Sequence, residues 1–211
     1  MAAVMLRDVF VNPAAFVAGY ALREFDQSVV EERMTLEQDF LATAADKLAQ
    51  NMSRIETCMT KLPVEFLWMR DSENENAVGN LLLHLEGNVR QWILSGIGGA
   101  PDSRDRPSEF SARSGPTASV LLTNLGATVD DALKAIRTLP HPRLVEKVSI
   151  QGYETSVLAA IVHVVEHFSG HTYQIILLTK RATRQDLGFY SYLARTGRKE
   201  TKEAKEHSGG Q

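Results

Sequence analysis

Apolar residues recur at helical spacing in four stretches of the chain, and charged or polar residues fill most positions between them. An apolar position every three or four residues gives a helix one face to bury. The pattern predicts helices over Leu36–Lys61 and over residues 77–95, 117–139 and 154–181. Together they predict an all-α fold, a four-helix bundle with a long crossover loop between its second and third helices.

The segments between the helices have a different composition. Residues 96–116 contain several glycines and prolines, which predicts the long crossover loop. Residues 145–153 alternate weakly between apolar and polar side chains, which is compatible with a short extended piece. Residues 186–193 carry three aromatic side chains, so we expect this segment to pack back onto the bundle.

The two ends of the chain are expected to lie outside the bundle. Residues 1–33 are predicted to be a dispensable N-terminal extension, residues 34–193 the helical bundle, and residues 194–211 a charged, disordered C-terminal tail. The apolar run at residues 9–22 is interrupted by Asn12 and Pro13 in its first part and is too short to cross a bilayer as a helix. We therefore expect neither a signal peptide nor a membrane anchor.

Charge and cysteine content narrow the partners and the compartment. The 211 residues include 23 Lys and Arg against 26 Asp and Glu, a formal net charge of −3. Without a basic excess, neither nucleic acid nor a membrane surface is expected as a partner. The single cysteine, Cys58, has no internal disulfide partner, which favours a reducing, cytoplasmic location. We expect its side chain to be buried filler.

Histidines are the candidate metal ligands. His167 and His171 lie four residues apart on one predicted helix, so both rings project from the same face. Nitrogen atoms of imidazole bind zinc-like ions at about 2.0 to 2.1 Å, so a third ligand has to come from a facing helix. His84 is the only histidine in another predicted helix. Three neutral histidines would leave coordination positions open for water or a substrate atom.

Spacing alone leaves two choices for the pair on the last helix. His163 lies one turn before His167, so His163 and His167 could chelate an ion as well as His167 and His171. Gly87, close to His84, and Gly170, between the latter two histidines, would let the two helices approach near that level. The glycines therefore favour His167 and His171 slightly.

Three segments resemble the DinB-like superfamily. They are NLLLHLEGNVRQWI at residues 80–93, the loop at residues 98–110, and HVVEHFSGHTYQI at residues 163–175. The resemblance covers about residues 34–192 and implies a four-helix bundle that binds zinc, nickel or a similar divalent ion. One histidine of the second helix and two of the last helix are the family's ligands. The last pair precedes a Gln by three residues, which matches Gln174 and selects His84, His167 and His171. The family often has Arg-Gly where this chain has Thr172-Tyr173.

The resemblance also implies a function. Characterised members are similar to thiol-dependent transferases and isomerases, so the leading hypothesis is a metal-dependent thiol S-transferase that uses bacillithiol, mycothiol or a similar thiol. Its partners would be a small-molecule thiol and an electrophile, and a homodimer is expected. No catalytic side chain is identified.

Two alternatives remain at this point. A metal-dependent hydrolase would need a base such as Glu166 or Glu86, although both are expected to be solvated or salt-bridged. The other alternative is a non-catalytic, metal-stabilised binding or stress-response module. In the crossover loop, the mixed-sign charges of Arg104, Arg106 and Glu109 are expected to be solvated.

Overall fold

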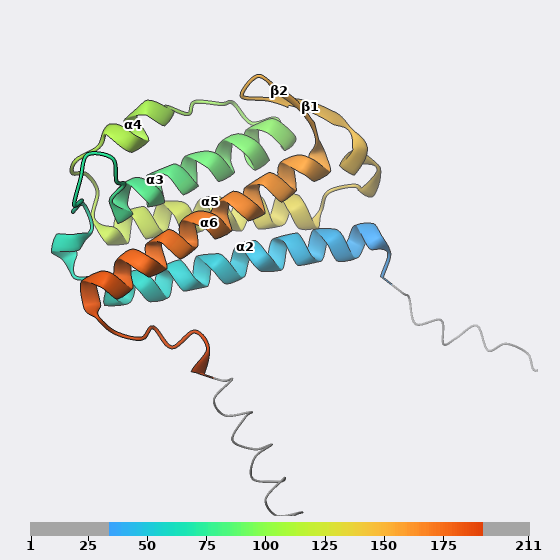
Figure 1. Ribbon diagram of the computed structural model, residues 1–211. Helices are drawn as coiled ribbons and strands as arrows, with labels where there is room; N and C mark the ends of the chain where they lie inside the picture. The colour runs from blue at the N-terminus through green and yellow to red at the C-terminus, as the bar shows by residue number, and fades with distance from the viewer. Residues whose placement is uncertain (1–33, 192–211) are drawn as a thin grey trace, which may run out of the picture. The chain divides into compact units, whose positions relative to one another are not determined.

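The computed structural model describes residues 34–191 (Figure 1). The predicted extension at residues 1–33 and the predicted tail at residues 194–211 lie outside the described residues. Four long helices dominate the described part, as predicted: α2 (Leu36–Lys61), α3 (Val78–Val89), α5 (Ala118–Arg137) and α6 (Val157–Thr183). The prediction of an all-α bundle is confirmed.

The four helices form a closed ring of neighbours. Both α2 and α3 pack against α5 and α6, so α2 lies opposite α3 and α5 lies opposite α6. Consecutive helices along the chain are therefore not all adjacent in space. This arrangement places α3 beside α6, and these are the two helices that carry the candidate metal ligands (Figure 1).

Local sequence signals explain where the long helices begin. Thr35 caps α2 in a reciprocal capping box with Gln38, and the hydroxyls of Thr117 and Ser156 accept hydrogen bonds from the first turns of α5 and α6. The apolar faces of all four helices meet in one core. Its large, fully buried side chains include Leu48, Ile55, Leu85, Leu125, Ile161 and Phe168.

The second predicted helix is not uniform. Its α-helical part ends at Val89 and continues as a π-helical segment, Arg90–Ile97, which holds the buried Trp92. π-Helical turns widen a helix locally and are frequent at functional sites. Periodicity did not predict this change.

The crossover loop contains a short helix, α4 (Arg106–Ser111), that packs against α3 (Figure 1). The side chain of Asp105 caps it, and Pro107 occupies its first turn. The sequence predicted the long crossover loop but not the short helix within it.

The weakly alternating stretch before the last helix forms a hairpin rather than one extended piece. Strands β1 (Lys147–Ile150) and β2 (Tyr153–Ser156) pair antiparallel, joined by Gln151 and Gly152. Both turn residues have positive φ angles, of 55° and 79°, as a type I′ turn requires. The last helix consequently begins at Val157 instead of the predicted residue 154.

Two further expectations concern burial and membranes. Cys58 is fully buried in the core, as predicted, and burial raises the pKa of its thiol.

Within residues 34–191, none of the helices has a stretch that is both long and apolar enough to cross a bilayer.

Candidate metal centre

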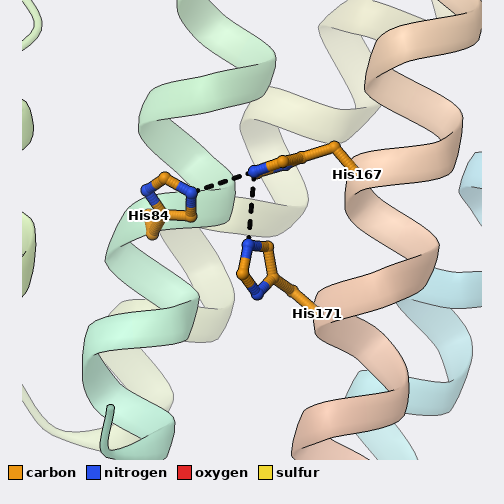
Figure 2. A group of neighbouring side chains, drawn as sticks. All are labelled: His84, His167 and His171. Atoms are coloured by element: carbon orange, nitrogen blue, oxygen red, sulfur yellow. Dashed lines mark hydrogen bonds between the residues drawn. The ribbon is translucent and has the colours of Figure 1, made fainter. Parts of the chain in front are cut away.

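Three imidazole rings meet between α3 and α6 (Figure 2). Nε2 of His84 on α3 lies 3.0 Å from Nε2 of His167 on α6, which in turn lies 3.2 Å from Nε2 of His171 one turn further along. Within the described part of the chain, these three histidines form a cluster whose ligand atoms all lie within 4.8 Å of one another. The structure thus brings together the three residues that the sequence singled out.

Hydrogen bonds on the far side of two rings set the direction of their Nε2 atoms. Nδ1 of His84 lies 2.8 Å from the carboxylate oxygen Oε2 of Glu109, and Nδ1 of His171 lies 2.8 Å from the amide oxygen Oε1 of Gln174. Both oxygens are acceptors for a proton on Nδ1. A neutral ring with its proton on Nδ1 has a lone pair on Nε2, and in both rings Nε2 faces Nε2 of His167.

Glu109 and Arg104 reach the site from the crossover loop. Arg104 grips the Glu109 carboxylate with two hydrogen bonds, Nε to Oε1 at 2.7 Å and Nη2 to Oε2 at 2.9 Å, and both side chains are at least 92% buried. Burial opposes ionisation of Glu109, but the hydrogen bonds from Arg104 and His84 outweigh it and lower the pKa of the carboxyl group. Glu109 is therefore an anion beside His84.

These two residues correct an expectation from the sequence. The loop charges were expected to be solvated, yet Arg104 and Glu109 form a buried ion pair behind a candidate ligand. Asn80 helps to hold the loop in place, because its amide donates hydrogen bonds to the backbone oxygens of Glu109 and Ala112. The only sequence feature that connected the loop with the site was its resemblance to the DinB-like superfamily. That resemblance did not assign a role to Arg104 or Glu109.

The two glycines near the histidines have roles other than the one expected. A Cβ atom on Gly87 would overlap Oε1 of Glu109 and lie 2.9 Å from Nε of Arg104, so this glycine makes room for the buried ion pair. A Cβ atom on Gly170 would have no heavy atom within 4 Å. Neither glycine serves close packing of α3 against α6, and the argument drawn from them was wrong.

His163 stands apart from the cluster. Its ring lies 4.0 Å, centroid to centroid, from the ring of Trp92 in the π-helical segment, at an angle of 34°. It also stacks on His167 at 5.5 Å. Partial burial lowers the pKa of His163. These contacts make His163 a packing neighbour of the cluster.

Two rings of the cluster, those of His167 and His171, favour the neutral form. Burial, and after it the positive charge that His171 and His84 would carry, lowers the pKa of His167 to about 3. Burial also lowers the pKa of His171, although the hydrogen bond with Gln174 opposes the shift. Neutral imidazole is the form that binds metal ions.

One side of the cluster is open. A hollow of about 390 Å³ lies on the α6 side and is lined by His163, Glu166, His167, Gly170, His171 and Gln174. The hollow therefore lies beside two of the three histidines of the cluster. A closed structural site would have a fourth protein ligand in this position.

The residues present fit a divalent metal ion. Two nitrogens on one ion lie about 3.4 Å apart in tetrahedral and about 3.0 Å apart in octahedral geometry for bond lengths of about 2.1 Å. The distances of 3.0 and 3.2 Å from His167 to the other two rings fall in this range, and all three ligand atoms lie within 4.8 Å of one another. If two of the three Nε2 atoms present lone pairs, only His167 can supply a proton between them, and this proton can form a hydrogen bond with one neighbour at a time. A metal ion, in contrast, accepts a lone pair from all three nitrogens. A neutral His167 that binds a cation through Nε2 carries its proton on Nδ1, which is buried and has no hydrogen-bond partner among the described residues.

Comparisons with known proteins agree with this fold. A family described as "Protein of unknown function (DUF1572)" matches residues 35–194. Two similar solved structures are a conserved protein from Enterococcus faecalis, with a TM-score of 0.60 and 11% identity, and a DinB-like protein, YjoA, from Bacillus subtilis, with a TM-score of 0.54 and 12% identity. The first covers 68% of this chain and the second 70%, in each case with 97% of the other chain.

The comparison with curated proteins found no match. The family match extends over most of the chain, and the structural matches extend over nearly the whole of each relative. The resemblance seen in the three sequence segments is thereby confirmed at the level of the fold. The chain belongs to the DUF1572 family and has the DinB-like fold.

Proposed function

We propose that the protein binds one divalent metal ion, zinc or nickel, through Nε2 of His84, His167 and His171, and uses it to transfer a small thiol onto an electrophile. The observation that carries the proposal is the convergence of three imidazole rings, two of which, those of His167 and His171, line an open hollow. A bound divalent cation lowers the pKa of a coordinated thiol, which makes the nucleophilic thiolate available near neutral pH.

The chain's own residues have distinct parts in such a reaction. Glu109 and Gln174 hold the rings of His84 and His171 so that their Nε2 atoms face the centre. Arg104 neutralises Glu109, and the pair stays ordered because it is buried. The hollow beside His167 and His171 would hold the two substrates next to each other, which favours their reaction.

Metal-dependent hydrolysis is a second candidate because Glu166 lines the same hollow as His167 and His171. Its exposed carboxylate could act as a base toward a water molecule in the hollow. Glu86, the other glutamate considered, instead forms an ion pair with Arg90 at 3.4 Å.

Activity measurements separate these functions. Purified protein is first assayed for bound metal and then for consumption of monochlorobimane with cysteine, glutathione, bacillithiol and mycothiol. Turnover that depends on both metal and one of these thiols supports the transferase. Hydrolysis of ester or amide substrates that is lost in Glu166→Gln supports the hydrolase, and bound metal with neither activity supports a binding module.

A further inference from the structure

A second hollow lies on the other side of α6. It is a groove of about 440 Å³ between α2 and α6, and most of its lining is apolar. Phe40 and Ala44 form its wall on α2, and Val162, Val165 and Tyr173 form its wall on α6. Val162 is 44% exposed and Tyr173 is 48% exposed, so the groove presents unusually apolar side chains at the surface.

The groove and the hollow of the histidine cluster meet on α6. Both are lined by Glu166 and Gly170. At Gly170 no side chain rises from the helix, and a Cβ atom there would have no heavy atom within 4 Å. Of the two residues that line both hollows, Gly170 therefore leaves α6 without a side chain between the apolar groove and the histidines.

Charge distinguishes the two ends of this combined surface. Lys47, which is exposed, lines the groove on the α2 side and forms no ion pair with any residue between 34 and 191. Arg54 adds a second cation nearby, where its Nη1 donates a hydrogen bond to the Tyr173 hydroxyl at 3.1 Å. Glu166 lines both hollows, so its negative charge does not distinguish them. Lys47 lines only the groove, so an anionic group is favoured at this end of the surface.

We infer that the groove between α2 and α6 binds a small amphipathic anion. Its acidic group lies at Lys47, its apolar body lies against Phe40 and Val162, and its uncharged end crosses Gly170 to the histidine cluster. A helix with its side chains is about 10 to 12 Å wide, so a molecule with a medium-length alkyl chain or two fused aromatic rings spans this path. The inference rests on the proposed function and names the class of its electrophile, an apolar molecule with a remote acidic group.

Binding is tested with the full-length protein and two probes, the fluorescent sulfonate 1-anilinonaphthalene-8-sulfonate and the fatty acid decanoate. We expect saturable binding of one probe molecule per chain, displacement of the fluorophore by decanoate, and at least tenfold weaker displacement by uncharged 1-decanol. Lys47→Glu should weaken binding at least tenfold, whereas Lys147→Glu, an exposed lysine on β1, should leave it unchanged. Equal affinities of the two variants would overturn the inference.

Orientation is tested with Co²⁺ in place of Zn²⁺ and nuclear magnetic resonance of bound decanoate. The paramagnetic ion should speed relaxation of the methyl-end protons several-fold more than that of the protons next to the carboxylate. The opposite gradient would overturn the inference. The titrations are repeated without metal, so that loss of metal binding, which would defeat the proposed function, does not hide binding in the groove.

A second copy of the chain is the competing occupant. Light scattering coupled to gel filtration decides it, with Val162→Glu as the test variant. A dimer that this change dissociates, together with absent fluorophore binding in the unaltered protein, would show that another chain covers the groove. A protein that binds the fluorophore, with a mass that Val162→Glu leaves unchanged, supports the inference.

Discussion

Oε2 of Glu109 lies 2.8 Å from Nδ1 of His84, although the two residues are 25 positions apart and on different elements. The contact makes the crossover loop part of the histidine cluster. Partners of this kind fix the orientation and tautomer of a ligand ring, and their loss commonly weakens metal binding 10- to 100-fold.

Replacing Glu109 should therefore impair metal binding without removing a ligand. Glu109→Gln keeps the shape of the side chain but loses its charge and leaves Arg104 without its counter-ion. We expect zinc affinity to fall about 10- to 100-fold, measured by competition with a chelator. Glu73→Gln is the control, because Glu73 pairs with Arg113 at an exposed site. Equal affinities of the two variants would show that Glu109 does not position His84.

Gly87 offers a steric test of the same contact. Alanine is favoured over glycine in a helix by about 1 kcal/mol, so Gly126→Ala on α5, where the new Cβ meets only Met52 at 3.7 Å, should stabilise the protein by roughly this amount. Gly87→Ala should instead destabilise it and weaken metal binding, because the methyl group displaces Glu109. Urea denaturation with and without zinc measures both effects. A stabilised Gly87→Ala variant with unchanged metal affinity would contradict the proposed role.

The histidines of α6 should differ in their effects. His171→Ala removes an Nε2 atom from the cluster, so we expect tight metal binding to be abolished. His163→Ala removes a ring that packs on Trp92, so we expect a loss of stability while metal binding is retained. Metal analysis of both purified variants checks this. A metal-free His163→Ala protein with a metal-loaded His171→Ala protein would reverse the ligand assignment.

Much of the bundle could be predicted from the sequence because its helices have long, regular apolar faces. His163, His167 and His171 of α6 share a face by local geometry alone, and the family resemblance selected the last two. His84 followed as the only histidine on another predicted helix. The hairpin was only partly recognised, since β1 and β2 are four residues each and the type I′ turn at Gln151-Gly152 carries no common signature.

Glu109 and Arg104 could not be placed from the sequence. Mixed charges in a loop are usually solvated. This pair is buried because α4 packs against α3 and because Gly87 has no side chain that would occupy the same space. The π-helical segment could not be predicted from the sequence either, because the contact between the rings of Trp92 and His163 depends on how this segment packs against α6. Contacts between distant segments decide these features, and local periodicity does not record them.

Acid should destabilise the metal-free protein before its carboxylates titrate. The pKa of His167 is about 3 in the folded state against about 6.5 in an unfolded chain, so only the unfolded state takes up a proton between these values. The free energy of unfolding should fall by up to about 1.4 kcal/mol per pH unit below pH 6.5 for this residue, and be unaffected by it above pH 6.5. Urea denaturation between pH 7.5 and pH 5 measures the slope.

His167→Gln serves as the comparison for the pH series. The lowered pKa values of His163 and His171 act in the same direction, so the variant should keep part of the slope and lose the share of His167. The carboxylate of Glu109, with its lowered pKa, adds stability that is lost only as the pH falls below about 4.5. Identical slopes for the two proteins would contradict a buried, neutral His167.

Calorimetric titration of the metal-free protein with Zn²⁺, paired with X-ray absorption spectroscopy of the product, tests the metal centre most directly. We expect one ion per chain, held by three imidazole nitrogens at about 2.0 to 2.1 Å, and no tight binding in His84→Ala. Binding that survives His84→Ala unchanged, or a shell without three imidazoles, would contradict a metal site between α3 and α6.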